Sequence, residues 1–142
     1  MNIEAILQNK GGEVVTVSCG TPVRDAVALL AERKIGALPV LKDEEVVGIM
    51  SERDVIYCIA RDGAGMLDWP VEKTMTSPIF SAAPGMPVLA ALGLMTERRI
   101  RHLPVLEGGR LVGLVSIGDL VKFRMDRIEA EAAALRDYIQ MA

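Results

Sequence analysis

Two short stretches of the chain carry residue types that could hold a small molecule. "GIMSERD" runs from Gly48 to Asp54, and "GLVSIGD" runs from Gly113 to Asp119. Each places a serine three residues before an aspartate, and so combines a hydroxyl with a carboxylate that accepts hydrogen bonds. Where such a phrase starts a helix, the free backbone amides also bind phosphate or hydroxyl groups. The spacing therefore allows a binding site at each phrase.

The same spacing also fits a capping box at the start of a helix. There the serine accepts a hydrogen bond from the amide three residues on, and the acidic side chain accepts one from the serine amide. Two features indicate that the phrase does more than cap a helix. The phrase recurs in stretches whose surface residues have diverged, such as Lys42 against Glu107, and a glycine before it allows another group to approach the backbone. Because one residue pair can both cap and bind, both interpretations stay open.

The remaining polar residues give little support to catalysis. The chain has one histidine, His102, and two cysteines, Cys19 and Cys58, which lie in unrelated contexts. They form no Ser-His-Asp set, no Cys-His set and no cluster of metal ligands. The serines of the two phrases have no identifiable base. We therefore expect a protein that is not an enzyme and that holds no metal.

The two phrases belong to an internal duplication. Residues 22–55 align with residues 87–120 at a constant offset of 65, and fifteen of the 34 paired positions are identical. The match continues upstream, where Thr16 falls on Ser81, and residues 3–7 resemble residues 71–75 at an offset of 68. Such self-similarity marks a repeated structural unit. The predicted division is a first repeat at 1–62, a linker at 63–70, a second repeat at 71–122 and a C-terminal helical extension at 123–142.

Each repeat predicts the same order of elements. Thr21 is expected as an N-cap with Pro22 at the first helical position, followed by apolar residues at helical spacing. An apolar strand, a polar turn ("KDEE" or "EGGR"), a second strand and a second helix follow. The strands expected before and after the first helix are 13–17 and 37–41 in the first repeat, and 78–82 and 102–106 in the second. The fold class is α/β, with a β-α-β-β-α unit present twice.

In this arrangement the chain resembles a known family. The stretches "IGALPV" and "IRHLPV", each followed by glycine, two apolar residues and Ser-x-x-Asp, are similar to the CBS domain. Two such domains in tandem resemble a Bateman module, and the resemblance covers roughly residues 3–122. With no catalytic domain attached, the chain is similar to stand-alone bacterial tandem-CBS proteins. The resemblance implies two repeats packed sheet to sheet with pseudo-twofold symmetry, leaving two clefts that each hold an adenine nucleotide.

The resemblance also implies which residues line each cleft. The aspartate binds the ribose hydroxyls, the serine contacts ribose or phosphate, and the facing repeat supplies its first strand and the residues before Leu-Pro. One cleft, called the Asp54 cleft, is then expected to use Ser51, Arg53, Asp54, Ile79, Ser81, Ile100, Arg101 and His102. The other, called the Asp119 cleft, is expected to use Thr16, Ile35, Gly36, Ala37, Ser116 and Asp119.

The two sets differ in charge. Arg101 and His102 stand where the first repeat has Gly36 and Ala37. Because arginine binds phosphate through two parallel hydrogen bonds, the Asp54 cleft is expected to prefer monophosphate or phosphate-rich ligands. A solvated arginine and a strand histidine that titrates near neutrality are the alternative interpretations.

The Asp119 cleft is expected to be uncharged on the facing side, with Gly118 beside the acid. On that basis it would accept a longer or less anionic ligand. The candidate ligands are AMP, ADP, ATP and NAD(H). S-adenosylmethionine, a cation without phosphate, is a further candidate for this cleft. A structural or partner-binding protein without nucleotide is the main alternative from another class.

After Asp119 the chain can continue as a helix to about Gln140, because no glycine or proline interrupts it after Gly118. Apolar residues step along it by four and three, which is a heptad stripe. The stripe consists of Val121, Met125, Ile128, Ala132, Leu135 and Ile139. We expect it to form a homodimer contact; packing along the chain's own repeats is the alternative.

Composition limits the other partners. The net charge is −3 and the pI is near 5.2, so no basic stripe for nucleic acid or anionic membrane is expected. Residues 1–10 contain polar and charged positions unsuited to a signal peptide, and no run reaches the roughly 18 apolar residues of a membrane helix. The two cysteines suggest no disulfide framework. We expect a cytoplasmic protein whose signal is read by a separate, unidentified effector protein.

Overall fold

Each repeat is built around a β-hairpin with a two-residue turn. In the first, β2 (Ala37–Lys42) pairs antiparallel with β3 (Glu45–Ser51); in the second, β4 (His102–Glu107) pairs with β5 (Arg110–Ser116). All four turn residues have positive φ, which is the conformation of a type I′ hairpin turn. The predicted strand-turn-strand units are therefore confirmed. This computed structural model describes residues 1–141.

Five α-helices and two short 3₁₀ segments accompany the hairpins in the described residues. The helices are α1 (Ile3–Lys10), α2 (Val23–Arg33), α3 (Glu52–Asp62), α4 (Val88–Arg98) and α5 (Ile117–Met141), and the 3₁₀ segments are Ala64–Asp68 and Val71–Lys73. One boundary differs from the prediction. Pro22 has φ −61° and ψ 141°, so it is the N-cap and the helix begins at Val23. Thr21 instead shares a hydrogen bond of 3.0 Å with the hydroxyl of Ser18.

The predicted first strand of each repeat is much shorter than expected. In place of 13–17, β1 consists of Val17–Ser18 and runs parallel to β2. In place of 78–82, only Ala82 forms an isolated parallel bridge, to Val105. The partner strands explain this difference. β2 contains Pro39 and β4 contains Pro104. A proline has no N–H, so it cannot donate the hydrogen bond that would extend the pairing with the first strand of the repeat.

Two hydrophobic cores form, one in each repeat, and the chain crosses between them. Ile3 and Ile6 of α1 are buried in the core of the second repeat, together with residues of that repeat such as Val88, Leu103 and Leu120. In return, the 3₁₀ segments bury Met66 and Val71 in the first core. The division at 1–62, 63–70, 71–122 and 123–142 stays a prediction about the sequence; in space the first ten residues pack with the second repeat.

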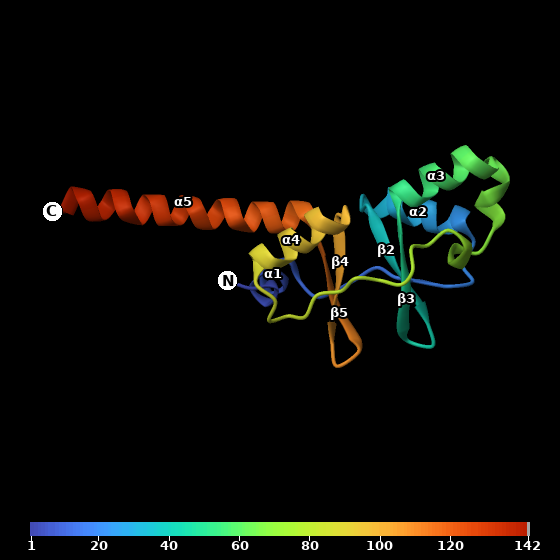
Figure 1. Cartoon of the computed structure of the whole chain (residues 1–142), viewed down its shortest axis with the longest axis horizontal. Coiled ribbons are helices and arrows are strands. Elements are labelled where there is room, and N and C mark those ends of the chain that lie inside the picture. The colour runs from blue at the N-terminus through green and yellow to red at the C-terminus, as the bar shows by residue number, and fades with distance from the viewer. Residues whose placement is uncertain (142) are drawn as a thin grey trace.

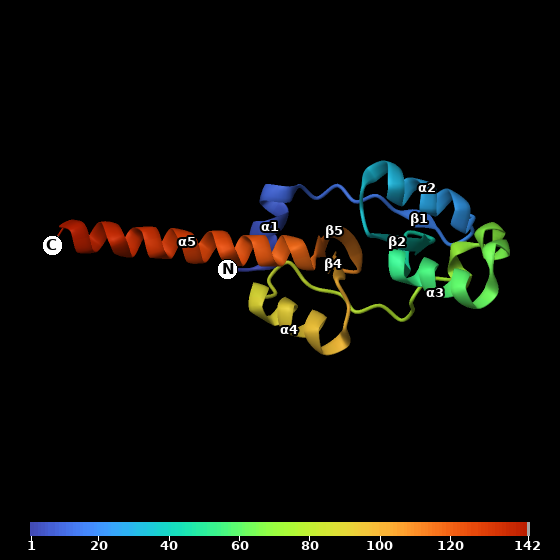
Figure 2. The same ribbon diagram turned by 90° about the horizontal axis from the view of Figure 1, so that it is seen from above.

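The hairpins stand side by side with their turns at the same end, and the helices lie on the outer sides (Figure 1). Figure 2 shows that the segments joining α1 to β1 and the linker to α4 pass on opposite sides of the hairpins. This arrangement agrees with the predicted packing of two similar repeats about an approximate twofold axis. Equivalent parts of the two repeats therefore face each other across the centre of the molecule.

Gly48 is packed by the segment between the linker and α4, and Gly113 is packed by α1. A Cβ on Gly48 would overlap the side chain of Met75, and a Cβ on Gly113 would lie 2.9 Å from Leu7 Cδ1. At the glycine of each phrase we expected another group to approach the backbone closely. In the structure that group is a side chain of the same protein, Met75 at Gly48 and Leu7 at Gly113.

The final helix, α5, extends far beyond the second repeat (Figure 1). The predicted helix is confirmed to Met141; residue 142 of the predicted extension lies outside the described residues. Met125, Leu135 and Ile139 of the heptad stripe are between 60% and 63% exposed. The alternative that the stripe packs along the chain's own repeats therefore fails for its distal half.

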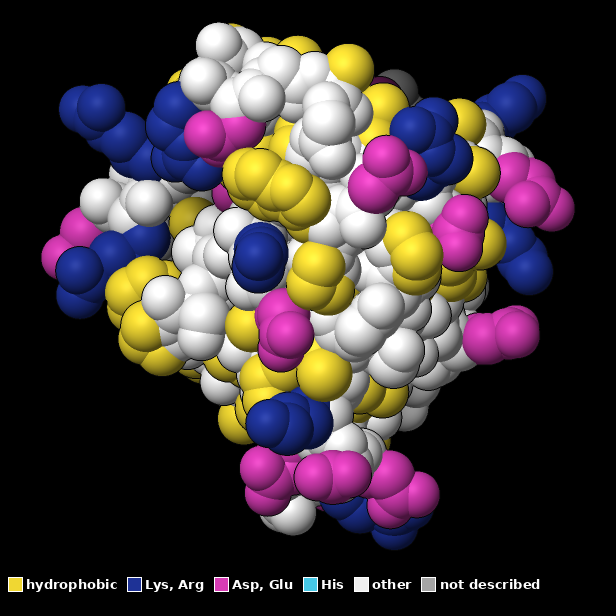
Figure 3. Space-filling model, turned by 90° about the vertical axis from the view of Figure 1, so that its right-hand side faces the viewer, with side chains coloured by type: hydrophobic (Ala, Val, Ile, Leu, Met, Phe, Trp, Pro, Cys, Tyr) yellow, Lys and Arg dark blue, Asp and Glu magenta, His cyan; other side chains and the backbone are white. Residues whose placement is uncertain are grey.

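The opposite end of the molecule, formed by α2, α3 and the first 3₁₀ segment, has a mixed surface. Figure 3 shows apolar side chains there interspersed with both lysine or arginine and acidic side chains. No basic stripe is visible on this face. Among residues 1–141, no helix combines the length and the apolar character needed to cross a membrane.

Candidate functional site

Each Ser-x-x-Asp phrase lies where a hairpin strand ends and a helix begins, and a cavity opens beside it. The cavity of the Asp54 cleft has a volume of about 220 Å³, and that of the Asp119 cleft about 440 Å³. Both are lined by residues of both repeats. A molecule held in either one would therefore touch the two halves of the chain at once.

Both phrases form the capping box that the spacing allows. The Asp54 carboxylate oxygen Oδ2 accepts hydrogen bonds from the backbone N–H of Ser51 at 2.8 Å and from its hydroxyl at 3.1 Å. The amide of Asp54 donates to Ser51 Oγ at 3.3 Å. The second oxygen, Oδ1, accepts a hydrogen bond of 2.9 Å from the hydroxyl of Thr76 in the crossing segment. Asp54 is thus held rigidly at the start of α3 and faces the cavity.

Four arginines surround the Asp54 cleft. Arg53 donates to the carbonyl oxygen of Arg99 at 3.1 Å, a contact between the repeats. The guanidinium of Arg98 lies 4.8 Å from the centre of the Phe80 ring, close enough for a cation–π interaction. Arg101 also lines the cavity. Among the described lining residues Asp54 is the one carboxylate, so the cleft is strongly cationic.

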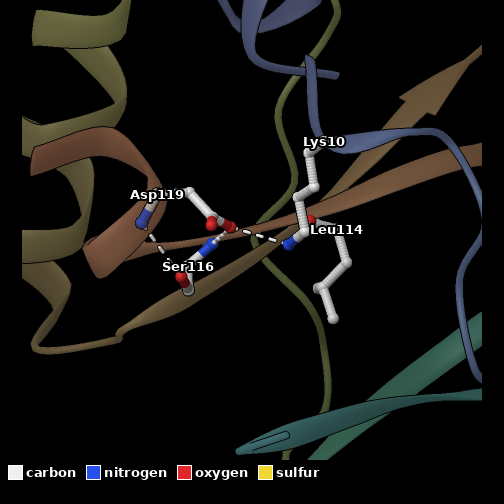
Figure 4. Close-up of polar contacts among 4 residues, drawn as sticks. All are labelled: Lys10, Leu114, Ser116 and Asp119. Carbon is white, nitrogen blue, oxygen red and sulfur yellow. Dashed lines mark hydrogen bonds and ion pairs between the residues drawn. The ribbon is translucent and has the colours of Figure 1, made fainter. Parts of the chain in front are cut away.

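The Asp119 cleft repeats the capping box but adds a lysine. Asp119 Oδ2 accepts from the amide of Ser116 at 2.9 Å, and the amide of Asp119 donates to Ser116 Oγ at 3.1 Å. The ammonium of Lys10 donates to the same Oδ2 at 2.7 Å and to the carbonyl of Leu114 at 2.8 Å (Figure 4). Burial alone would raise the pKa of Asp119, but these hydrogen bonds and the Lys10 charge hold it below its ordinary value.

The Asp119 cleft is not uncharged on its facing side, and this expectation was wrong. Lys10, Lys34 and Arg101 line it, with Glu52 as a second carboxylate. Lys34 is the C-cap of α2 and takes a left-handed conformation. It lies three residues before the start of β2 at Ala37, and it lines the cavity. Lys10 comes from a segment that the repeat alignment does not reach.

Arg101 and His102 were expected in the Asp54 cleft alone, but they line both cavities, as does Ala37. His102 therefore lies in the wall between the clefts. Burial, followed by the charges of Arg101 and Lys10, lowers the pKa of His102, and Glu52 and Asp119 only partly oppose this. The imidazole is accordingly neutral near pH 7.

Most of the predicted site residues are brought together. Those that line the Asp54 cleft are Ser51, Arg53, Asp54, Ile79, Ile100, Arg101 and His102. Those that line the Asp119 cleft are Ile35, Gly36, Ala37, Ser116 and Asp119. Thr16 and Ser81 line neither cavity; each directly precedes the residue that pairs with a hairpin strand, Val17 or Ala82.

Sequence reasoning missed several lining residues. Lys34 and Arg99 occupy equivalent positions directly before "IGALPV" and "IRHLPV", so a cation at that place in both repeats was an available signal. Glu52 follows Ser51 within the phrase. Thr76 and Lys10 gave no such signal, because both lie outside the aligned ranges of the two repeats. Within residues 1–141 no group of three or more His, Cys, Asp or Glu is placed to hold a metal ion.

Comparison with known proteins agrees with the duplication. The family model described as "CBS domain" matches residues 9–61 and 71–126. The CBS domain-containing protein CBSX3, mitochondrial, of Arabidopsis thaliana is 33% identical over 97% of this chain and 71% of its own length. The CBS-domain containing protein ATU1752 from Agrobacterium tumefaciens has a TM-score of 0.85 at 38% identity, covering 87% of this chain and 99% of that one.

A more distant structure shares the fold and contains ligands. The CBS domain pair of protein MJ0100, in complex with 5′-methylthioadenosine and S-adenosyl-L-methionine, has a TM-score of 0.79 at 22% identity, covering 89% of this chain and 98% of that one. At that identity the similarity concerns the fold.

Proposed function

The chain belongs to the CBS-domain family as a pair of repeats, and on that premise we propose that it is a non-catalytic sensor of adenine nucleotides. AMP, ADP, ATP or NAD(H) would bind in the Asp54 and Asp119 clefts. CBS pairs with this fold hold adenosine-containing ligands, as the MJ0100 complex does. The proposed setting is cytoplasmic and reducing, in keeping with the free thiols of Cys19 and Cys58.

One observation carries the proposal: each cleft sets a carboxylate at a helix start opposite several cations. A nucleotide has a ribose diol that donates hydrogen bonds and a phosphate that attracts positive charge. The carboxylate suits the first group, and arginine or lysine suits the second. The groups offered are Asp54 with Arg53, Arg98, Arg99 and Arg101, and Asp119 with Lys10, Lys34 and Arg101.

Both clefts therefore favour phosphate-bearing ligands, with the smaller Asp54 cleft suited to a monophosphate and the Asp119 cleft to a longer molecule. S-adenosylmethionine is disfavoured in the Asp119 cleft, because its cation would face three others. The difference in ligand preference between the two clefts is therefore attributed to cavity size, and not to an uncharged wall in the Asp119 cleft.

The proposed output is a change in how the repeats sit together and in assembly. A ligand that contacts both repeats shifts their relative arrangement by the difference between its affinities for the two states, and by no more. The exposed stripe on α5 offers a surface for a homodimer, and an effector protein would read the change. No reaction is part of this proposal.

A second candidate is a partner-binding CBS protein without nucleotide. The capping geometry favours it, since both oxygens of Asp54 already accept hydrogen bonds within the chain. Under this reading the two phrases only begin helices. The presence of four arginines around one carboxylate is then left without a role.

Isothermal titration on the wild-type protein separates the two candidates. AMP, ADP, ATP, NAD⁺ and NADH would be compared with GMP and S-adenosylmethionine. Saturable binding of at least one adenine nucleotide, tighter than GMP, supports the sensor. Absence of heat for every nucleotide, from protein shown to be folded by circular dichroism, would leave the partner-binding role as the better account.

A further inference from the structure

The ion pair between Lys10 and Asp119 joins residues 109 positions apart. Lys10 is the last residue of α1, and Figure 4 shows its side chain reaching across to the carboxylate while its ammonium also meets the carbonyl of Leu114. The side chains of Lys10 and Asp119 are 40% and 27% exposed, so the pair is partly shielded from water. It lies inside the cavity that the proposed ligand would occupy.

The position of Lys10 is fixed by the rest of α1. Ile3 and Ile6 are buried in the second core, and Leu7 packs on Gly113. The N–H of Gly11 donates to the carbonyl of Leu7 at 2.7 Å and closes the helix directly after Lys10. The backbone of Lys10 is therefore anchored, and only its side chain is free to move.

The two clefts differ at this point. In the Asp54 cleft the crossing segment offers the hydroxyl of Thr76, which is neutral and can rotate to donate elsewhere. In the Asp119 cleft the last residue of α1, Lys10, offers an ammonium. The equivalent carboxylates are therefore engaged by groups of different charge.

Ligand access to Asp119 depends on this ammonium. Oδ2 has two acceptor positions, which the amide of Ser116 and Lys10 occupy, whereas Oδ1 accepts no hydrogen bond from the described residues. A ribose diol that donates one hydrogen bond to each oxygen must displace Lys10 from Oδ2. The displaced ammonium then shares the cavity with Lys34 and Arg101. Only a ligand that brings negative charge compensates it.

From this geometry we propose that Lys10 is a specificity-determining residue: it makes the Asp119 cleft select nucleotides that carry phosphate and reject uncharged nucleosides. This inference rests on the proposed function, because it assumes that Asp119 receives a ribose. AMP offers Lys10 a new partner when it leaves the carboxylate. Adenosine offers none, and so meets the full cost of breaking the ion pair.

The test compares AMP with adenosine by isothermal titration in an Asp54→Asn background, which leaves the Asp119 cleft as the remaining site. Lys10→Met keeps most of the length of the side chain and removes its charge. We expect adenosine to bind roughly 2- to 5-fold more tightly to the Lys10→Met variant, a range typical of losing one partly exposed ion pair. AMP binding should stay the same or weaken, so that the preference for AMP over adenosine falls.

Lys34→Met is the matched control, since it removes the same charge from the same cavity without touching Asp119. It should weaken AMP without strengthening adenosine. If Lys10→Met behaves in the same way as Lys34→Met, Lys10 contributes only general charge and the inference is overturned, although the nucleotide site stands. If neither AMP nor adenosine binds to the Asp54→Asn protein or to the wild type, the proposed function fails, and the inference fails with it.

A measurement without ligand provides an independent check. In Lys10→Met the pKa of Asp119, followed by NMR of its carboxyl carbon, should rise because the hydrogen bond and the positive charge of Lys10, which both favour the ionised form, are lost. An unchanged pKa would mean that the ion pair is absent in solution, and would overturn the inference whatever the nucleotide affinities are.

Discussion

Glu52 of the first repeat and His102 of the second meet over the same backbone position. A Cβ on Gly36 would lie 2.8 Å from Glu52 Oε1 and 3.1 Å from His102 Nε2. Gly36 thus lies where the two repeats are in close contact, beside the wall between the clefts. It is a glycine because a side chain there would push the two neighbours apart.

Gly36→Ala should therefore disturb both clefts together. The added methyl group forces His102 and Glu52 to move, and His102 lines both cavities. We expect weaker AMP binding at each site, with the free energy of unfolding changed by no more than about 1 kcal/mol, because both neighbours are side chains that can shift. Titration calorimetry checks this.

Gly20→Ala is the control, since a Cβ at Gly20 meets no atom within 4 Å. If Gly36→Ala binds AMP as the wild type does at both sites, the wall between the clefts is more adaptable than its geometry indicates.

Stability should depend on pH through His102. Burial, together with the nearby Arg101 and Lys10, lowers the pKa of His102 from the ordinary 6.5. The unfolded chain then binds the proton more readily than the folded one. The contribution of neutral His102 to the free energy of unfolding is therefore fully present above pH 6.5, and it decreases as the pH falls from there to the lowered pKa. Urea unfolding between pH 5 and 8 measures the slope.

His102→Gln should flatten that slope, because it removes the titrating group while keeping a polar side chain. The pKa of Asp119 is lowered from 3.8, so its contribution is lost only at more acid pH and does not overlap this window. An identical slope in His102→Gln would assign the pH dependence to another group.

The two hairpin turns make opposite predictions for stability. Asp43 and Glu44 have φ of 50° and 68°, a region that disfavours residues with a Cβ, whereas the equivalent turn uses Gly108 and Gly109. Glu44→Gly should raise the free energy of unfolding by about 0.5–1 kcal/mol. Chemical denaturation gives the value.

Gly109→Glu serves as the reciprocal change, and should destabilise the protein by about 1 kcal/mol for the same reason. The account of the turns fails if both substitutions shift stability in the same direction.

The stripe on α5 should control assembly. Met125, Leu135 and Ile139 are all more than half exposed, and a second copy of the helix would cover them. Leu135→Lys should convert the expected dimer to a monomer in analytical ultracentrifugation, because the lysine places a charge in the apolar contact.

Asp137→Lys changes charge on a different face of the same helix and should leave the assembly intact. A wild-type protein that is monomeric at concentrations of tens of micromolar would rule out this use of the stripe.

The repeated features of the fold could be predicted from the sequence because each rests on local chemistry. Ser51 and Ser116 cap helices through contacts three residues away, and both hairpins follow from a turn between two apolar strands. The alignment of the repeats also paired residues that the structure brings together around two cavities. These signals are short in sequence and occur twice.

What escaped prediction depends on contacts that are distant in the chain. Lys10 reaches Asp119 only because α1 packs in the second core, and nothing in the alignment indicates that crossing. The expected strand at 78–82 was reduced to a bridge because its neighbour β4 contains Pro104, and the effect of that proline appears only once the strands are paired. Charge in the Asp119 cleft was likewise underestimated, because part of it comes from α1.

The central claim is that Asp54 and Asp119 are nucleotide acceptors as well as helix caps. Its most direct test is AMP titration of the wild type, Asp54→Asn, Asp119→Asn and the double variant. Asparagine keeps the shape of the side chain and much of the cap, but removes the carboxylate. Loss of one class of site in each single variant and of all binding in the folded double variant is the result we predict. Wild-type AMP affinity in the double variant would contradict the claim and reduce both phrases to helix caps.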